Sequence, residues 1–465
     1  MTVSTEREEY CKNEKKWKLV RDVTESNVTS YIRDVDKRDP DRNIRYKNDA
    51  QFTNFTSRTK SGLVGAVFRK DLVVDLPSDI EYVRDDATGF KVSLSKLAQK
   101  ITGEVLITGR YGLLVDYPAS EDGLTAQEVS DMDLRARIYT YSAESIINWQ
   151  VKLVNGSPKL LLVVLKECVN DLSDDGFTWV ENHQYRVLRM VNGGYTQSIY
   201  DKDEELIDVM IPRDKNGNAW DYIPFVFVGS EDNDSEIDSI PLYDLANLNI
   251  GHLKNSADYE ESVFLVGQPT LVIGTEMSSE QFKDANPGGV LFGSRRGLNL
   301  GVAGHANLLQ AAPNQLADVA MQRKEEQAVM MGARLVMVQA DRETAVAARM
   351  RHSGETSILS TIAHNVQDAL IQCMKFLNRF MSGQDSLDGV HLVINDHFFD
   401  ENVDPNALMA QIQLFNSKII AKSDIRQYLR ATGVVEETRN DDEIEADISA
   451  NPPEEIDSTV GIDTL

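Results

Sequence analysis

Apolar residues recur at helical spacing over a long stretch of the chain, from Pro313 to Met381. Residues 313–335 predict one helix, and a second begins near Glu343. The apolar positions of the second recur at steps of three and four: Ile358, Ile362, Val366, Leu370, Cys373, Leu377 and Phe380. Such steps place all of them on one helix face. Unbroken from Glu343 to Met381, this helix would be about 58 Å long at 1.5 Å per residue. That length is more typical of a part of a mechanical assembly than of a pocket wall.

The rest of the chain alternates between helical and strand patterns. Short apolar runs separated by Asn-Gly turns predict a mostly antiparallel β unit between residues 135 and 228. Residues 1–50 are highly charged with little periodicity, and 270–312 are rich in glycine. Helical patterns cover residues 52–68, 92–105, 241–266, 406–420 and 423–431, and a strand pattern covers 391–394. Together these elements predict an α+β fold.

The charge balance is strongly acidic, with a net charge of −26 over 465 residues. Nine acidic residues and no Lys or Arg lie between 441 and 465, so we expect this tail to be disordered. A protein that binds DNA phosphates tightly would normally be basic. A protein through which DNA must pass without adhering would not be basic. No apolar run is long enough for a membrane span, and the first residues lack an apolar signal core. We therefore expect synthesis in the cytoplasm.

Catalytic signatures are missing from the sequence. It contains no phosphate-binding G-x-x-x-x-G-K-[ST], dinucleotide-binding G-x-G-x-x-G, G-x-S-x-G or H-E-x-x-H motif, and no cysteine pair with zinc spacing. The densest ligand-type group comprises His391, Asp396, His397, Asp400 and Glu401. We interpret it as polar loop residues and predict no catalytic residue, metal or cofactor.

Two short segments are candidate contact sites, although neither contains a catalytic motif. Arg295 and Arg296 form a basic pair within the glycine-rich segment, where they could touch phosphates or remain solvated. Val338, Gln339, Ala340, Asp341 and Arg342 form the break between the two long helical patterns. As a plain turn between helices, this break needs no function.

The order of these elements resembles that of the portal (head–tail connector) proteins of tailed bacteriophages. Three segments carry the likeness. Pro241 to Asn249, leading to Gly267–Ile273, is similar to the first stem helix and the start of the clip. Glu343–Arg349 with Glu355 and Asn365–Leu370 resembles the wing helix below the tunnel loop, and Asp404–Gly433 resembles the crown. The likeness covers roughly residues 50–440.

The resemblance implies a division of the chain into portal parts. The wing would comprise residues 1–240, the first stem helix 241–267, the clip 268–312, the second stem helix 313–337 and the tunnel loop 338–342. The long wing helix and a strand would occupy 343–400, the crown 401–440 and the acidic tail 441–465. Val338–Arg342 would then face the channel, and Arg295 and Arg296 would belong to the clip.

The resemblance also implies partners. The chain would form a ring, usually of twelve copies, at one capsid vertex of a virion. That ring would dock terminase, head-completion or adaptor proteins and the major capsid or scaffolding protein. Double-stranded DNA would pass through it without sequence specificity, and no membrane or enzymatic activity is implied. Two alternatives stay open: another head or minor capsid protein without a channel, and a metal-dependent hydrolase built on residues 391–401.

Overall fold

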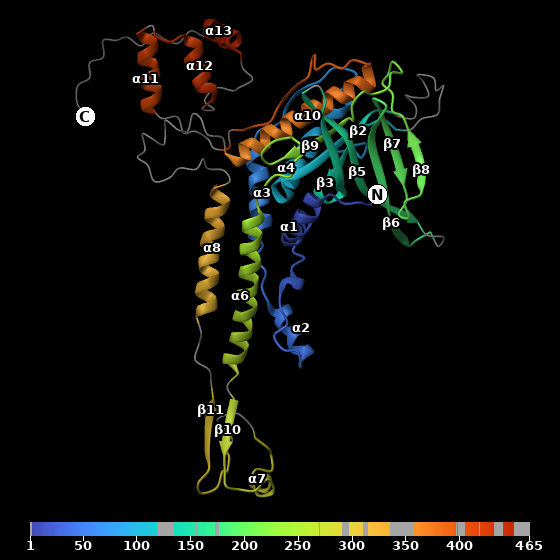
Figure 1. The fold of residues 1–465 in the computed structure, drawn as a ribbon. Helices are drawn as coiled ribbons and strands as arrows, with labels where there is room; N and C mark the ends of the chain where they lie inside the picture. The colour runs from blue at the N-terminus through green and yellow to red at the C-terminus, as the bar shows by residue number, and fades with distance from the viewer. Residues whose placement is uncertain are drawn as a thin grey trace, which may run out of the picture. The chain divides into compact units, whose positions relative to one another are not determined.

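A computed structural model describes the chain in two compact units, Met1–Asp396 and His397–Leu465. The described residues are 2–118, 134–154, 156–172, 176–268, 270–290, 297–309, 315–334, 357–396, 398, 405–417, 419–431 and 440–450. They contain both α-helices and antiparallel sheets (Figure 1), which confirms the expected α+β class.

The first unit begins with helices, and the fourth α-helix, α4 (Leu94–Thr108), is largely buried. The three preceding α-helices are α1 (Glu8–Thr24), α2 (Pro40–Asp49) and α3 (Phe55–Val67). Residues 1–50 show little periodicity in the sequence, yet they contain both α1 and α2. Helix α1 buries only four side chains, and the charged residues between them hide the periodicity in the sequence. Short 3₁₀ turns, η1 (Thr29–Tyr31) and η2 (Glu81–Arg84), connect these helices.

Two antiparallel sheets form the predicted β unit. In the first, β2 (Arg110–Asp116) lies between β3 (Arg137–Ser142) and β9 (Phe225–Gly229). The turn η3 (Ala143–Ser145) leads from β3 into the second sheet, whose five strands follow chain order. These strands are β4 (Ile146–Val154), β5 (Ser157–Leu172), β6 (Trp179–Val191), β7 (Gly194–Tyr200) and β8 (Leu206–Met210). Tight turns such as Asn192-Gly193, where both φ angles are positive, connect them.

Helix α10 (Ile358–Ser382) packs against β9, α4 and β2. All seven residues of its predicted apolar stripe lie within it, but an unbroken helix through Ser357 is excluded, and the predicted start near Glu343 lies outside the described residues. Ser357 has extended backbone, and its hydroxyl accepts a hydrogen bond from the Ser360 N–H at 3.1 Å. A serine in this arrangement caps a helix N-terminus, so α10 begins at Ile358. The strand β12 (His391–Val393) follows and pairs with β1 (Val73–Asp75).

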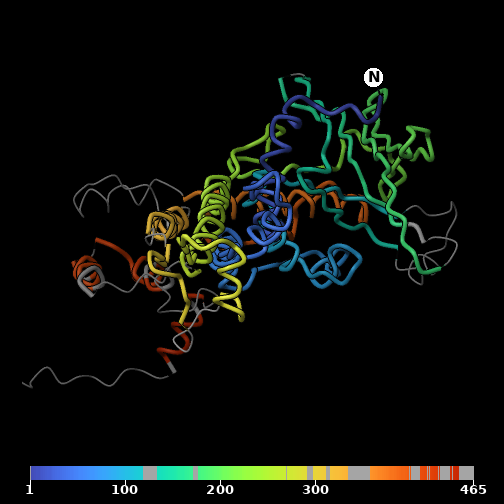
Figure 2. The backbone as a smooth tube through the Cα atoms, turned by 90° about the horizontal axis from the view of Figure 1, so that it is seen from below, coloured from blue at the N-terminus to red at the C-terminus, as the bar shows by residue number. Residues whose placement is uncertain are grey.

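The first unit also contains a long helical hairpin. Helix α6 (Tyr243–Gly267) leads to β10 (Thr270–Gly274) and the short helix α7 (Ser279–Ala285). Strand β11 (His305–Leu309) pairs with β10, and α8 (Leu316–Arg334) returns along α6. Figures 1 and 2 both show α6 and α8 side by side.

The described residues of the second unit form three helices: α11 (Pro405–Asn416), α12 (Lys422–Ala431) and α13 (Asp441–Ala450). Helix α13 contradicts the disorder we predicted for the start of the acidic tail. Asn440 Oδ1 accepts from the Glu443 N–H at 2.8 Å, and the Asn440 N–H donates to Glu443 Oε2 at 3.1 Å. This reciprocal cap stabilises the helix N-terminus, where acidic residues are also favourable. Residues 451–465 lie outside the described part of the chain.

Candidate functional site

The hairpin of α6 and α8 contains two of the longer described helices of the first unit. Helix α6, with 25 residues, is about 37 Å long at 1.5 Å per residue. Gly251 on α6 allows a close approach, because an added Cβ would lie 3.1 Å from Lys324 Cε on α8. Next to it, His252 Nε2 lies 3.2 Å from Glu325 Oε1. A small residue and a polar pair therefore set how closely the two helices approach.

The root of the hairpin is fixed by buried polar contacts. Asn249 of α6 is fully buried, and its Oδ1 accepts hydrogen bonds from the Thr56 N–H and hydroxyl, both at 3.2 Å. Its Nδ2 donates to the Thr53 carbonyl at 2.8 Å. Asn249 thus satisfies one of the free N–H groups at the N-terminus of α3. The Leu242 N–H, just before α6, donates to the Leu106 carbonyl of α4 at 3.2 Å.

The N-terminal region braces the middle of α6. The Tyr46 hydroxyl donates to Asp258 Oδ1 at 2.7 Å, and Arg42 pairs with Glu261 at 2.7 Å. Burial, together with the Asp258 carboxylate, raises the pKa of Tyr46 to about 12, so its hydroxyl stays protonated as the donor. At least one charged residue of the first fifty positions, Arg42, therefore forms a structural ion pair with α6.

A buried arginine holds the segment that leads into the hairpin. The Arg110 guanidinium lies between the rings of Trp149 and Phe227, 4.1 Å and 4.2 Å from their centroids. Its Nη1 donates to the carbonyls of Ser235 and Glu236, both at 2.9 Å. Burial lowers the pKa of Arg110 to about 9. This residue thereby ties the acidic loop before α6 to the sheet.

Apolar side chains remain exposed on both long helices. Three consecutive residues near the end of α6, Val263, Phe264 and Leu265, are 49%, 53% and 55% exposed. On α8, Val329 and Met330 are 74% and 58% exposed. Consecutive apolar residues point in different directions around a helix, so α8 alone cannot cover them. This surface is typical of a helix that packs against another protein chain.

The far end of the hairpin is a two-stranded ribbon with a compact loop. β10 and β11 pair from Thr270↔Leu309 to Gly274↔His305. Ser278 and Gln281 form a capping box at α7. Asn286 and Asn299 are linked by hydrogen bonds of 2.9 Å and 3.0 Å across the loop.

Most of the predicted site residues lie outside the described residues. These are the whole break Val338, Gln339, Ala340, Asp341 and Arg342, the pair Arg295 and Arg296, and His397, Asp400 and Glu401. In the described part, His391 is exposed on β12, and Asp396 Oδ2 lies 3.3 Å from His364 Nε2. Their roles as predicted therefore stay predictions.

Two groups of possible metal ligands lie together among the described residues, and neither was predicted from the sequence. One is Cys168, Glu181 and His183, and the other is Asp232, Asp234 and Asp238. The first could not be found by spacing, because Cys168 and His183 meet only through the register of β5 and β6. The second lies in the acidic loop that precedes α6.

These features define a mixed α/β fold whose first unit carries the long α6–α8 hairpin. Residues 241–381 match the model of a family described as a domain of unknown function (DUF4055). The match includes α6, the ribbon, α8 and most of α10. No curated protein matches the chain. No described helix is both long enough and apolar enough to cross a membrane.

Two solved structures resemble the chain in fold. One is a chain from the virion of a native gene transfer agent (GTA) particle, with 12% identity and a TM-score of 0.39. It covers 83% of this chain and 91% of its own. The other, from the neck of an empty GTA particle, has 13% identity and a TM-score of 0.39, covering 81% and 90%. Because both TM-scores are low, the function proposed for this chain rests on its own sequence and geometry.

Proposed function

We propose that the protein is a structural component of the head or neck of a phage-like particle, and specifically a portal protein that forms a ring around a DNA channel. The observation that carries the proposal is the α6–α8 hairpin, which leads out of the α/β core to a small ribbon and back. This path has the order stem, clip, stem. The sequence resemblance assigns the same order to residues 241–337.

The exposed apolar residues of the hairpin support assembly into a ring. Val263–Leu265 on α6 and Val329–Met330 on α8 are each about half exposed or more. In a ring, each hairpin has a neighbour on either side, and both faces become buried. Burying apolar surface between neighbouring copies stabilises the assembly by about 25 cal/mol per Å². Each copy in a closed ring therefore contributes to its stability.

Electrostatics fits a conduit better than a DNA clamp. Helix α6 carries four acidic residues against a single lysine, and the whole chain has a net charge of −26. An acidic channel holds phosphates weakly, which suits DNA that moves in during packaging and out during ejection. We assign the narrowest part of the channel to Val338–Arg342. Arg295 and Arg296 are assigned to the clip, where head-completion or adaptor proteins dock.

The remaining assignments follow the same proposal. The wing comprises residues 1–240 and 343–400, and the crown comprises 401–440. Terminase supplies the ATPase activity, since this chain has no phosphate-binding motif. The capsid or scaffolding protein surrounds the ring at the vertex.

Electron microscopy of the purified protein tests the proposal. We expect rings with an axial hole about as wide as a DNA duplex. Val329→Glu should release smaller species with an unchanged circular dichroism spectrum, because it places a charge in the contact between copies. The matched control is Val191→Glu, which places the same charge on an exposed valine of β6, outside the hairpin.

The outcomes separate the alternatives. A monomer at high concentration contradicts the portal assignment. Closed oligomers without a central hole favour another head or minor capsid protein. Rings that tolerate Val329→Glu as well as the control would show that the exposed α8 face does not hold the copies together.

A further inference from the structure

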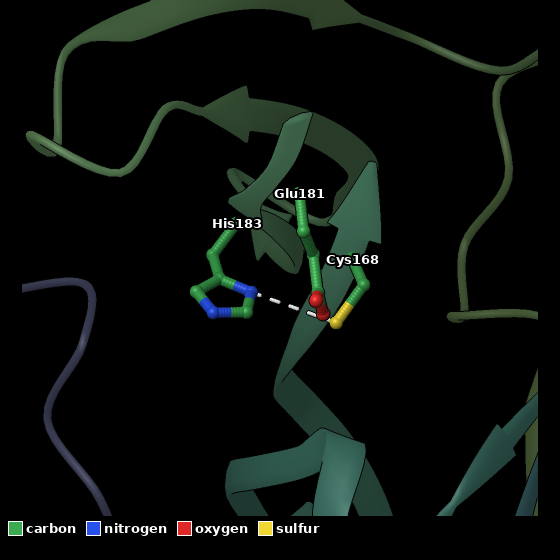
Figure 3. Close-up of side chains that lie close together, drawn as sticks. All are labelled: Cys168, Glu181 and His183. Carbon is green, nitrogen blue, oxygen red and sulfur yellow. Dashed lines mark hydrogen bonds between the residues drawn. The ribbon is translucent and has the colours of Figure 1, made fainter. Parts of the chain in front are cut away.

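Three side chains with different metal-ligating atoms lie together on the five-stranded sheet. Cys168 of β5 is the register partner of His183 on β6. Glu181 precedes His183 by two residues, so its side chain lies on the same face of the sheet. Figure 3 shows the three side chains pointing toward one another. All three are exposed, which leaves this face of the cluster open to solvent.

The sulfur–nitrogen distance matches that of a tetrahedral zinc site. Typical Zn–S and Zn–N bonds of about 2.3 Å and 2.0–2.1 Å, at a tetrahedral angle, place sulfur and nitrogen about 3.6 Å apart. Cys168 Sγ lies 3.5 Å from His183 Nδ1, and all three ligand atoms lie within 4.8 Å of one another. We propose that Cys168, Glu181 and His183 bind one Zn²⁺ ion, with water in the fourth position.

The donor set selects the kind of metal. A thiolate and an imidazole are ligands for zinc and similar transition metals, whereas calcium and magnesium require oxygen ligands. The sheet presents these donors in advance, because neighbouring strands hold the Cys168 and His183 side chains directly opposite each other. Little rearrangement is needed when the ion binds.

The cluster has no evident role in packing. The stabilising contacts of this part of the sheet lie on its other face, where Glu167 accepts hydrogen bonds from Tyr141 and Arg186 at 2.7 Å and 2.6 Å. Cys168 and His183 add no buried surface to that network. The second acidic group is a weaker candidate, because the carboxylates of Asp232, Asp234 and Asp238 already accept backbone N–H hydrogen bonds.

Zinc titration of the full chain, followed by competition with a colorimetric chelator, tests the proposal. We expect one Zn²⁺ per chain. Cys168→Ser and His183→Ala should each weaken binding by at least about tenfold, because even loss of an outer-shell partner has an effect of that size. Cys11→Ser is the matched control, since Cys11 is also an exposed cysteine but has Glu6, and no histidine, beside its sulfur. The zinc affinity of the Cys11→Ser variant should equal that of the unmodified chain.

A chemical readout accompanies the titration. Zinc should slow alkylation of Cys168 by iodoacetamide while Cys11 reacts at its original rate, and Co²⁺ should give a thiolate charge-transfer band that Cys168→Ser removes. Circular dichroism checks that each variant is folded. The proposal is overturned if no stoichiometric zinc binds, if Cys168→Ser binds as tightly as the unmodified chain, or if zinc protects both cysteines equally. These results do not depend on whether the protein forms rings.

Discussion

Gly109, which ends helix α4 just before β2, has a conformation that only glycine adopts easily. Its φ is +68° and its ψ 4°, the left-handed region. An alanine Cβ at this position would lie 2.5 Å from the carbonyl oxygen of Ser239 and 3.0 Å from that of Asp238. Both are backbone atoms of the segment that leads into α6. Gly109 therefore sets how closely the root of the hairpin approaches the core.

Gly109→Ala should destabilise the protein by about 3 kcal/mol. Left-handed backbone costs a non-glycine residue about 1–2 kcal/mol, and forced overpacking costs about 1–3 kcal/mol more. The Ser239 carbonyl cannot move away freely, because it accepts a hydrogen bond of 2.7 Å from the Ser230 hydroxyl. The assay is equilibrium unfolding in urea, followed by tryptophan fluorescence.

The control is Gly193→Ala in the β6–β7 turn. Gly193 has φ +85°, but nothing lies within 4 Å of its added Cβ. Gly193→Ala should lower the free energy of unfolding only by the cost of left-handed backbone, about 1 kcal/mol. Replacing glycine by alanine also reduces the entropy of the unfolded chain, and this stabilising effect is the same in both variants. If the two variants lose the same free energy of unfolding, within about 0.5 kcal/mol, the backbone contact at Ser239 does not constrain the root and the reasoning is refuted.

Three further predictions concern the core, the root of α6 and the sheet. Trp17→Phe should lower the free energy of unfolding in urea by about 2 kcal/mol, because it leaves the buried Thr108 carbonyl without its 2.8 Å donor. The control Trp179→Phe replaces a side chain that is 66% exposed and should change stability by less than about 0.5 kcal/mol. Asn249→Ala should cost about 2–3 kcal/mol and exposed Asn247→Ala almost nothing; equal losses would contradict the capping of α3 by Asn249. Burial opposes ionisation of Glu167, but hydrogen bonds from Arg186, Tyr141 and Gln184 outweigh it and hold its pKa below the ordinary value of 4.5. Its stabilising contribution is therefore present above pH 4.5 and is lost as the pH falls through the lower folded pKa, so the stability gap between the unmodified chain and Glu167→Gln should narrow on acidification; a constant gap from pH 7 to pH 3 would refute this.

The sequence predicted elements wherever the hydrophobic pattern was strong and local. The apolar stripe of α10 has a clear helical period, because one face of this helix is buried against β9, α4 and β2. The pattern failed where burial is sparse or charges dominate. Helices α1 and α13 are examples, since α1 buries few residues and α13 depends on the reciprocal cap at Asn440.

Contacts between distant segments were decided only by the tertiary structure. The register of β5 and β6 brings Cys168 opposite His183, fifteen positions away, and no spacing rule for a single strand or helix could find that pair. The cap that Asn249 gives to α3 joins residues 193 positions apart. Periodicity in a sequence reports which face of an element is buried. It does not report which element lies against that face, because that depends on how the whole chain packs.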